Sequence, residues 1–180
     1  MSIVKVTLLE KSNLPALCQH LRRHIAESGR DGDVVFSPRS ADDVFDEAEA
    51  TKRHRAAWAR RIDEPYWTRT WGLLIDGVIR GHIDLHGGRV RSESHRVTLG
   101  MGIERVARQQ GHGRTMLDIA IAWARDREMA WVDLGVFAKN APARKLYLSA
   151  GFVEVATTPD RFRVDGERID DITMTLALTG

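Results

Sequence analysis

Arg108-Gln109-Gln110-Gly111-His112-Gly113 lies between two stretches of different periodicity. Residues 97–103 (VTLGMGI) alternate apolar residues with small or polar ones, which is the period of a strand. Residues 114–127 (RTMLDIAIAWARDR) contain no glycine or proline and are rich in good helix formers. A glycine-punctuated turn between a strand and a helix leaves several backbone N–H groups unpaired and aimed at one place. Such a turn is typical of an anion site, most often for phosphate, so this stretch predicts a phosphate-bearing ligand.

The overall composition indicates one globular domain over residues 1–180. Hydrophobic residues make up 43% and charged residues 29%, enough for a sizeable core. The 27 basic residues nearly cancel the 25 acidic ones, and a net charge of +2 argues against a nucleic-acid partner. The single cysteine, Cys18, excludes an internal disulfide or a cysteine metal cluster and is expected to be a small buried hydrophobe. Without a signal-like segment or an apolar run of about 18 residues, we expect a cytoplasmic protein with no membrane span.

Two helices are predicted in the N-terminal third, after a strand over residues 3–9. The first carries leucine and isoleucine at helical spacing and is expected to end at Gly29. A loop over residues 28–40, rich in Gly, Ser and Asp, follows it. The second helix is predicted from about Ala41 to Ile62, with Ser40 as a candidate cap.

Strands dominate the rest of the pattern. Asp76-Gly77 and Asp165-Gly166 are strong signals for two hairpins, and residues 131–137 form a further strand pattern. With the strand and helix around the glycine turn, the predicted order is β-α-α-β-β-β-α-β-α-β-β. This order describes a mixed α/β fold, a sheet with helices packed on it.

The strand over residues 78–85 carries a polar face next to an apolar one. Alternation places Ile79, Gly81, Ile83 and Leu85 on one face, and Arg80, His82, Asp84 and His86 on the other. Two histidines and an aspartate are a candidate metal set. However, alternate strand residues lie ~6.7 Å apart, too far for their side chains to converge readily on one ion. We therefore expect a solvated or substrate-facing surface, and no metal.

A short helix over residues 141–149 brings an amide and a phenol to one side. Asn140 is placed to cap this helix, with Pro142 in its first turn and Gly151 just past its end. At 3.6 residues per turn, Asn140 and Tyr147 fall within ~20° of each other. Alone, the pair is explained by capping and packing; beside the phosphate turn, it indicates a shared site.

Together these residues resemble the GNAT superfamily of acyl-CoA-dependent N-acetyltransferases. The family signature R/Q-x-x-G-x-G/A is matched by residues 108–113, and Ile103 stands where the family usually has Val. Asn140, Ala143, Leu146-Tyr147 and Gly151-Phe152 look like the family's second block, and residues 165–174 look like its closing hairpin. The resemblance covers roughly residues 70–178, plus the two N-terminal helices by topology. It implies a central, mostly antiparallel mixed sheet of about seven strands flanked by about four helices.

The resemblance implies acetyl-CoA as co-substrate and assigns roles on that basis. Tyr147 matches the general acid, and the backbone near Met101 matches the oxyanion donor. Asn140 would hold the pantetheine or the substrate, and Gly100 and Gly102 would permit close approach of the pantetheine arm. The implied cofactor-binding residues are Met101, Gly102, Ile103, Arg108, Gln109, Gln110, Gly111, His112, Gly113, Arg114 and Asn140.

The general base stays unassigned, because Val97 stands where some members carry a glutamate. Glu93 and His95 are candidates to activate a water, and catalysis through ordered water is an alternative. Acceptor contacts are expected from residues 28–40 and 160–170, with Phe36, Glu93, His95 and Arg161 as candidate substrate-binding residues. Both segments mix charge signs, so a small amine and a peptide or protein amine are both compatible.

The leading functional hypothesis is acetyl transfer to a primary amine by direct attack in a ternary complex. A non-catalytic acyl-CoA-binding module is the alternative from a different class, and an aminoacyl-tRNA acetyltransferase is a third. Trp67 and Trp71, near the sheet edge, are further candidates for substrate contact. The late hairpin and exposed apolar strands are candidates for a homodimer contact.

Overall fold

The computed structural model describes residues 2–40 and 42–178. Over these residues, strands and helices follow the predicted order. The strands are β1 (Val4–Leu8), β2 (Thr68–Ile75), β3 (Val78–Gly87), β4 (Arg96–Ile103), β5 (Trp131–Phe137), β6 (Val153–Val164) and β7 (Glu167–Ala177). The α-helices are α1 (Leu14–Ala26), α2 (Glu47–Ala59), α3 (His112–Arg125) and α4 (Ala141–Ser149), and three short 3-10 turns are η1 (Lys11–Asn13), η2 (Arg91–Glu93) and η3 (Arg105–Ala107).

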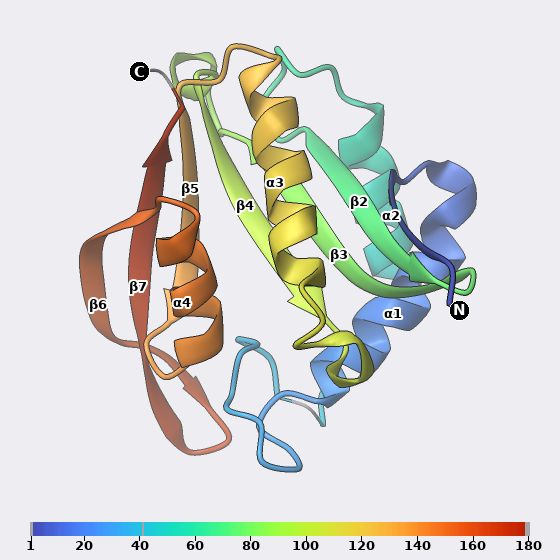
Figure 1. Ribbon diagram of the computed structural model, residues 1–180, viewed down its shortest axis with the longest axis vertical. Helices are drawn as coiled ribbons and strands as arrows, with labels where there is room; N and C mark the ends of the chain where they lie inside the picture. The colour runs from blue at the N-terminus through green and yellow to red at the C-terminus, as the bar shows by residue number, and fades with distance from the viewer. Residues whose placement is uncertain (1, 41, 179–180) are drawn as a thin grey trace.

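All seven strands join one twisted sheet in the order β1-β2-β3-β4-β5-β7-β6. The pairing is antiparallel everywhere except between β4 and β5, which run parallel. This parallel pair is short: residues 96–98 of β4 lie opposite residues 131–133 of β5, and the two strands then diverge (Figure 1). The second half of β4 therefore has no β5 partner across from it.

Helices cover both faces of the sheet. α3 and α4 lie on the near face in Figure 1, over β3–β4 and over β5–β7, while α1 and α2 lie on the far face. The main core joins α3 to the central strands through a run of fully buried side chains. This run includes Met116, Leu117, Ala120 and Ala124. Each large side chain of this kind stabilises the fold by about 1.5–3 kcal/mol on burial.

Several single-residue expectations are confirmed. Asp76 and Gly77 have φ of 50° and 81°, and Asp165 and Gly166 have φ of 49° and 83°, the doubly positive geometry of tight hairpin turns. Cys18 is fully buried. Trp67 and Trp71 pack on Trp123 inside the main core, and Trp67 also lines a cavity on the α2 side of the sheet. No helix in the described residues has the length and apolar content that crossing a membrane requires.

The second helix is shorter than predicted. Its expected start at Ala41 lies outside the described residues. Ser40 does accept a hydrogen bond, from Asp42 N at 3.1 Å, but it closes only a local turn. The helix begins at Glu47, where Asp46 accepts from Glu49 N at 2.8 Å, and it ends at Ala59 instead of Ile62. Two competing caps thus precede one helix, and the one next to the helical run prevails.

A β-bulge corrects the predicted faces of β3. Leu73 lies opposite Gly81, but the next residue of β2, Leu74, lies opposite Ile79. The extra residue, Arg80, shifts the alternation. Ile79 therefore packs with Leu17 of α1 in a separate cluster, instead of joining Ile83 and Leu85 in the main core.

Candidate active site

The turn between β4 and α3 presents a run of unpaired backbone donors. Gln109 and Gly111 have φ of 59° and 81°, and α3 starts directly afterwards. In the described residues, the backbone N–H groups of residues 109–113 donate to no protein group, as expected for an anion site. The backbone N–H of Arg114, another implied cofactor-binding residue, is not free, because it donates to Gly111 O at 3.1 Å. The buried Nε2 of His112 has no partner either, so a second kind of polar atom is left for a ligand at this turn.

Several side chains of the same turn bind other groups of the protein. Arg108 donates through Nε to Ile103 O at 2.8 Å, and its two terminal nitrogens bind Asp33 and Glu27, each at 2.7 Å. Gln110 donates to Val106 O, and Arg114 pairs with Asp118. Among the predicted cofactor residues of the turn, Arg108, Gln110 and Arg114 therefore contribute structure through their side chains.

The free edge of β4 points toward β5. Glu104 N donates to Arg80 O at 2.8 Å, and hydrogen-bonded pairs alternate along an antiparallel ladder. The backbone N–H groups of Met101 and Ile103 therefore point away from β3. On that side β5 has already diverged, so these N–H groups lack a strand partner in the described residues. An extended ligand with carbonyl groups fits such an edge.

The absence of a side chain at Gly102 leaves space for histidine rings of the protein. A Cβ at Gly102 would lie 2.2 Å from His24 Nε2 and 2.8 Å from His82 Cε1. On this face of β4, the absent side chain makes room for two rings of the protein. Gly100 has only His86 Nε2 nearby, at 3.8 Å. The close approach expected for a pantetheine arm is thus supplied on this face at Gly100 more than at Gly102.

α4 lies beside the turn, on the same face of the sheet as α3 (Figure 1). Asn140 caps this helix by accepting from Ala143 N at 3.3 Å, as predicted, and its amide nitrogen donates to no group in the described residues. Tyr147 is 6% exposed and packs on Phe152 with 5.8 Å between ring centroids. Burial raises the pKa of the Tyr147 phenol to about 12. A Cβ on Gly113 would lie 3.1 Å from Leu146, so α4 adjoins the turn.

A pocket of about 240 Å³ opens beside Met101 on the α1 side of the sheet. Phe36, from the loop after α1, stacks on His24 at 4.7 Å between ring centroids, and the Arg108 guanidinium lies 5.1 Å from the Phe36 ring. Phe36 is therefore placed beside the turn, where a substrate contact was expected. The lining consists of Leu21, His24, Ile25, Phe36, Ser37, Pro38, Arg39, His82 and Met101.

A larger cavity of about 450 Å³ adjoins this pocket and shares Leu21, Ile25 and Arg39 with it. Buried Asp84 lies in its wall and binds Thr70. Acidic and basic groups from α2 complete a mixed lining, including Glu49 and Arg53. Both cavities therefore lie on the α1–α2 side of the sheet, and the smaller one includes Met101.

The polar face of β3 is covered by α1 and α2, so of the two expectations, a solvated or a substrate-facing surface, the first is wrong for most of it; His82, Asp84 and His86 line the two cavities. His82 lies directly opposite Gly102, and its Nδ1 lies 2.8 Å from His20 Nε2. His20 is fully buried, and its Nδ1 lies 2.8 Å from Glu104 Oε1. No group of three metal-binding side chains is found among the described residues.

Burial controls the charges in this network. It lowers the pKa of His82 to about 4, against the raising effect of Asp84. Burial also lowers the pKa of His24 to about 2, with His82 and His20 acting in the same direction. For Glu104, burial alone would raise the pKa, but hydrogen bonds from His20, Arg23 and Arg80 lower it to about 2. At neutral pH, the network holds an ionised Glu104 and a neutral His82.

Three predicted substrate residues lie away from this pocket. Glu93 accepts from Arg89 N at 2.8 Å within the η2 turn, and the exposed His95 precedes β4. His95 is eight residues before Ile103, about 26 Å along an extended strand. Arg161 lies on β6 with its guanidinium 5.7 Å from the Phe162 ring. The structure therefore brings Phe36 to the pocket and leaves Glu93 and His95 at the other end of β4.

The loop after α1 and the late hairpin meet, as their shared expected role requires. Val35 of the loop packs with Phe137 at the end of β5 and with Val164 and Ile169 of the hairpin. In Figure 1 both segments lie at the end of the sheet where β4 and β5 diverge. Two segments more than a hundred residues apart thus pack together at the same end of the sheet.

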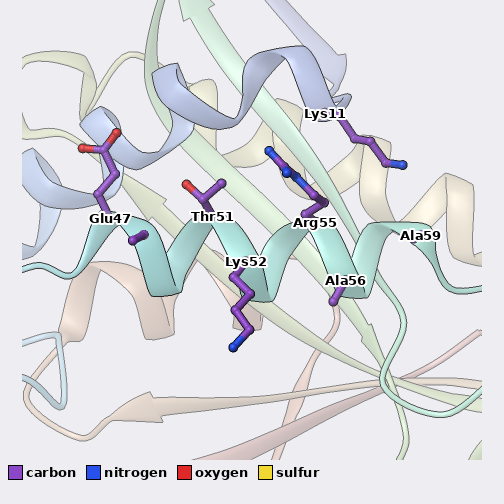
Figure 2. Close-up of a pocket in the computed structure, with 8 residues that line it drawn as sticks. Lys11, Glu47, Thr51, Lys52, Arg55, Ala56 and Ala59 are labelled. Carbon is purple, nitrogen blue, oxygen red and sulfur yellow. The ribbon is translucent and has the colours of Figure 1, made fainter.

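A further hollow lies elsewhere. It is an open groove of about 900 Å³ lined by α2 and Lys11, and Figure 2 shows the side chains that line it. The Lys11 and Arg55 side chains extend along it, with Glu47 at the other end. None of the predicted site residues lines it, so its size does not make it the reaction site. Its lining is Lys11, Glu47, Ala48, Thr51, Lys52, Arg55, Ala56 and Ala59.

The residues beside the site that the sequence did not predict are His20, His24, Glu104, Glu27 and Asp33. Only the spacing of His20 and His24, four residues apart on one helix face, was a usable signal. The partners of the other three residues lie 72 to 84 positions away in the chain.

The sequence matches the model of the acetyltransferase (GNAT) family over residues 35–152. No curated protein matches the chain. Among solved structures, a GNAT-family acetyltransferase from Streptococcus pneumoniae is similar, with a TM-score of 0.81 and 20% identity. That alignment covers 97% of this chain and 99% of the other.

Two further structures illustrate the range of similar proteins. A putative acetyltransferase from Salmonella typhimurium, solved with its cofactor acetyl-CoA, has a TM-score of 0.79 at 18% identity, covering 98% of this chain and 94% of its own. The ribosomal-protein-S18-alanine N-acetyltransferase from Escherichia coli has a TM-score of 0.71 at 22% identity, covering 99% of this chain and 96% of its own. At these identities the similarity establishes the shared fold.

Proposed function

Because the chain belongs to the acetyltransferase (GNAT) family, we propose that residues 1–180 form one domain that transfers acetyl from acetyl-CoA to a primary amine. The amine attacks directly in a ternary complex and belongs to a small molecule, a peptide or a protein. The observation that carries the proposal is the meeting of three features at one place. These are the free N–H run of residues 109–113, the unpaired edge of β4 and the pocket beside Met101.

The donor side of the proposed site follows from the backbone. The N–H groups of residues 109–113 bind the pyrophosphate, whose charge suits the start of α3. The pantetheine arm, with its amide groups, extends along the free edge at Met101 and Ile103. The backbone N–H of Met101 donates to the thioester oxygen as negative charge develops there. The free amide nitrogen of Asn140 holds the arm from the α4 side.

Tyr147 supports the departing sulfur. A phenol with a pKa of about 12 stays protonated across the physiological range and can donate a hydrogen bond. Full transfer to a thiolate of pKa about 8.5 is uphill by about 3–4 pKa units. Tyr147 therefore acts mainly by donating a hydrogen bond to the sulfur as its charge grows.

The proposed acceptor is a class of compound, the primary amines. One similar structure is a ribosomal-protein alanine acetyltransferase, and another is described as a putative phosphinothricin N-acetyltransferase, so both a protein amine and a small-molecule amine are candidates. The mixed charges of the cavity near α2 favour neither a strongly acidic nor a strongly basic acceptor. The residue candidates for acceptor contact are Phe36, which borders the pocket, and Arg161 on the late hairpin.

The proposal is tested by two measurements on the purified protein. Thermal unfolding with coenzyme A measures the donor site, and acetyl-CoA consumption across a panel of amines and peptides measures transfer. We expect stabilisation by coenzyme A and turnover with at least one amine. Stabilisation without turnover would identify a non-catalytic acyl-CoA-binding module, and absence of stabilisation would contradict the whole assignment.

A further inference from the structure

Three side chains form a hydrogen-bonded chain from Glu104 through His20 to His82. His20 Nδ1 lies 2.8 Å from Glu104 Oε1, and His20 Nε2 lies 2.8 Å from His82 Nδ1. His20 is 0% and Glu104 2% exposed, so both are held between α1 and the sheet. The proposed roles of the turn, β4 and α4 use none of these three residues.

The ionised carboxylate of Glu104 determines which ring nitrogen of His20 carries the proton that it accepts. An ionised Glu104 accepts only, so His20 donates to it through Nδ1–H. Arg23 and Arg80 also bind Glu104. With one proton on each ring, His20 Nε2 accepts and His82 donates to it through Nδ1–H. His82 therefore has its lone pair on Nε2.

The Nε2 atom of His82 is free and accessible. It makes no hydrogen bond in the described residues, and it is not among the fully buried atoms without a partner, which are His24 Nδ1 and His112 Nε2. Asp84 Oδ2 lies 3.8 Å away. His82 and Met101 line the same pocket of about 240 Å³, and His82 lies opposite Gly102, the residue after Met101. A lone pair thus lies beside the proposed acetyl site.

We propose that His82 is the general base of the acetyl transfer, with His20 and Glu104 as its positioning residues. This assignment rests on the proposed function and adds the group that accepts the amine proton. The amine nitrogen forms its bond to the acetyl carbon and gives a proton to His82 Nε2. The carbon–sulfur bond breaks, and the thiolate leaves with the bonding electron pair and is protonated by solvent while Tyr147 donates a hydrogen bond to it.

Burial disfavours the imidazolium that this step creates, and Asp84 opposes that effect. Asp84 faces Nε2 from the same strand, and Glu104 faces the other ring nitrogen through His20. Asp84 is therefore close to the positive charge when it appears, with Glu104 one ring further away, and both carboxylates offset part of the cost of burial. The other titratable groups that face His82 are His20 and His24 of α1, His54 of α2, and His86 of β3.

The proton positions are tested by nitrogen-15 NMR of the histidine-labelled protein at neutral pH. We expect His82 to show a protonated Nδ1 and an unprotonated Nε2, and we expect Glu104→Gln to change that signature. A His82 ring protonated at Nε2 would overturn the assignment. This measurement needs no acceptor and no turnover.

The catalytic role is tested by kinetics with the amine that turns over best in the panel. His82→Asn keeps an amide nitrogen near the position of Nδ1, so it can still donate to His20, but it lacks the base. We expect kcat to fall by about 100-fold or more, while KM for acetyl-CoA changes less than about 3-fold. For Glu104→Gln we expect a loss of about 10-fold in kcat. A kcat for His82→Asn within 3-fold of the wild type would overturn the proposal.

A matched control and a binding measurement separate the possible failures. His95→Asn makes the same change in an exposed histidine at the far end of β4, and we expect kcat to be unchanged. Coenzyme A should stabilise His82→Asn as much as the wild type, which shows that the site is folded. If the wild type acetylates no amine, the proposed function fails and the role of His82 fails with it. If the wild type is active and His82→Asn is equally active, only the base assignment fails.

Discussion

Arg108 and Asp33 form an ion pair with 2.7 Å between nitrogen and oxygen, across 75 positions of sequence. The same guanidinium binds Glu27 at 2.7 Å and Ile103 O at 2.8 Å. One side chain thus holds the loop after α1 against the end of β4, next to the unpaired N–H groups.

Replacing Arg108 with Lys should destabilise the protein, because an ammonium cannot reach all three partners in the plane of a guanidinium. These side chains are 20–27% exposed, and after allowance for solvent screening we expect a loss of roughly 2 kcal/mol in the free energy of unfolding. Urea unfolding measures this loss. Arg163→Lys, which alters an exposed pair with Asp160, serves as control and should unfold like the wild type.

Gly111→Ala should weaken coenzyme A binding beyond its effect on folding. Gly111 has φ of 81° in open space, so the methyl group costs about 1 kcal/mol through backbone strain alone. Gly77 has the same φ, also in open space, in the β2–β3 turn. Both alanine variants should therefore lose similar stability, but only Gly111→Ala should lose affinity in calorimetric titration with coenzyme A. Equal affinities in the two variants would place the anion elsewhere.

Gly102→Ala should be poorly tolerated, because its methyl group would lie 2.2 Å from His24 Nε2. We expect a loss of roughly 2 kcal/mol, on the scale of overpacked cores. Gly100→Ala, on the same strand and face, meets only His86 at 3.8 Å and should cost much less. The double variant Gly102→Ala, His24→Ala should be less destabilised than the sum of its two single variants. Strict additivity would show that the ring is not the obstacle.

Tyr147→Phe should lower kcat without weakening coenzyme A binding. The phenol oxygen donates to no group in the described residues, so its removal should change stability by less than about 1 kcal/mol. If the hydroxyl supports the leaving sulfur, we expect kcat to fall by about 100-fold. Steady-state kinetics and a coenzyme A thermal shift measure the two quantities separately. An unchanged kcat would remove Tyr147 from the reaction.

Stability should fall in acid through Glu104. Its pKa is lowered from 4.5 to about 2 in the folded protein, so its contribution is present above about pH 4.5 and is lost as pH falls toward 2. That shift corresponds to about 3 kcal/mol at most. Equilibrium unfolding from pH 6 to pH 2.5 should show a smaller loss for Glu104→Gln than for the wild type. Parallel losses in the two proteins would assign the acid sensitivity to other carboxylates.

Local signals predicted the parts of the site that the chain builds from neighbouring residues. The turn at Gly111, the cap at Asn140 and the two Asp-Gly hairpins depend on a few consecutive residues, and each forms as the sequence indicates. Position along the strand carries information too, since Glu93 and His95 stand too far before Ile103 to reach the turn.

The buried network could not be predicted because its members come together only after α1 packs on the sheet. Glu104 lies 84 positions from His20, and His82 lies 62 positions away. The β-bulge at Arg80 has the same origin, since Ile79 turns toward α1 to pack with Leu17. Alternation along β3 alone places Ile79, Gly81, Ile83 and Leu85 on one face. In the structure, Ile79 packs in a different cluster from Ile83 and Leu85.

The divergence of β4 and β5 leaves the sheet unfinished at its centre. Two antiparallel halves share three residue pairs in the described chain, and beyond them the backbone of β4 has an open row of hydrogen-bonding groups. Open strand edges invite other chains to pair with them. A molecule with amide groups at the spacing of a strand fits this position. The bound co-substrate would therefore pair with β4 as a neighbouring strand does, and this pairing would form and break in each turnover.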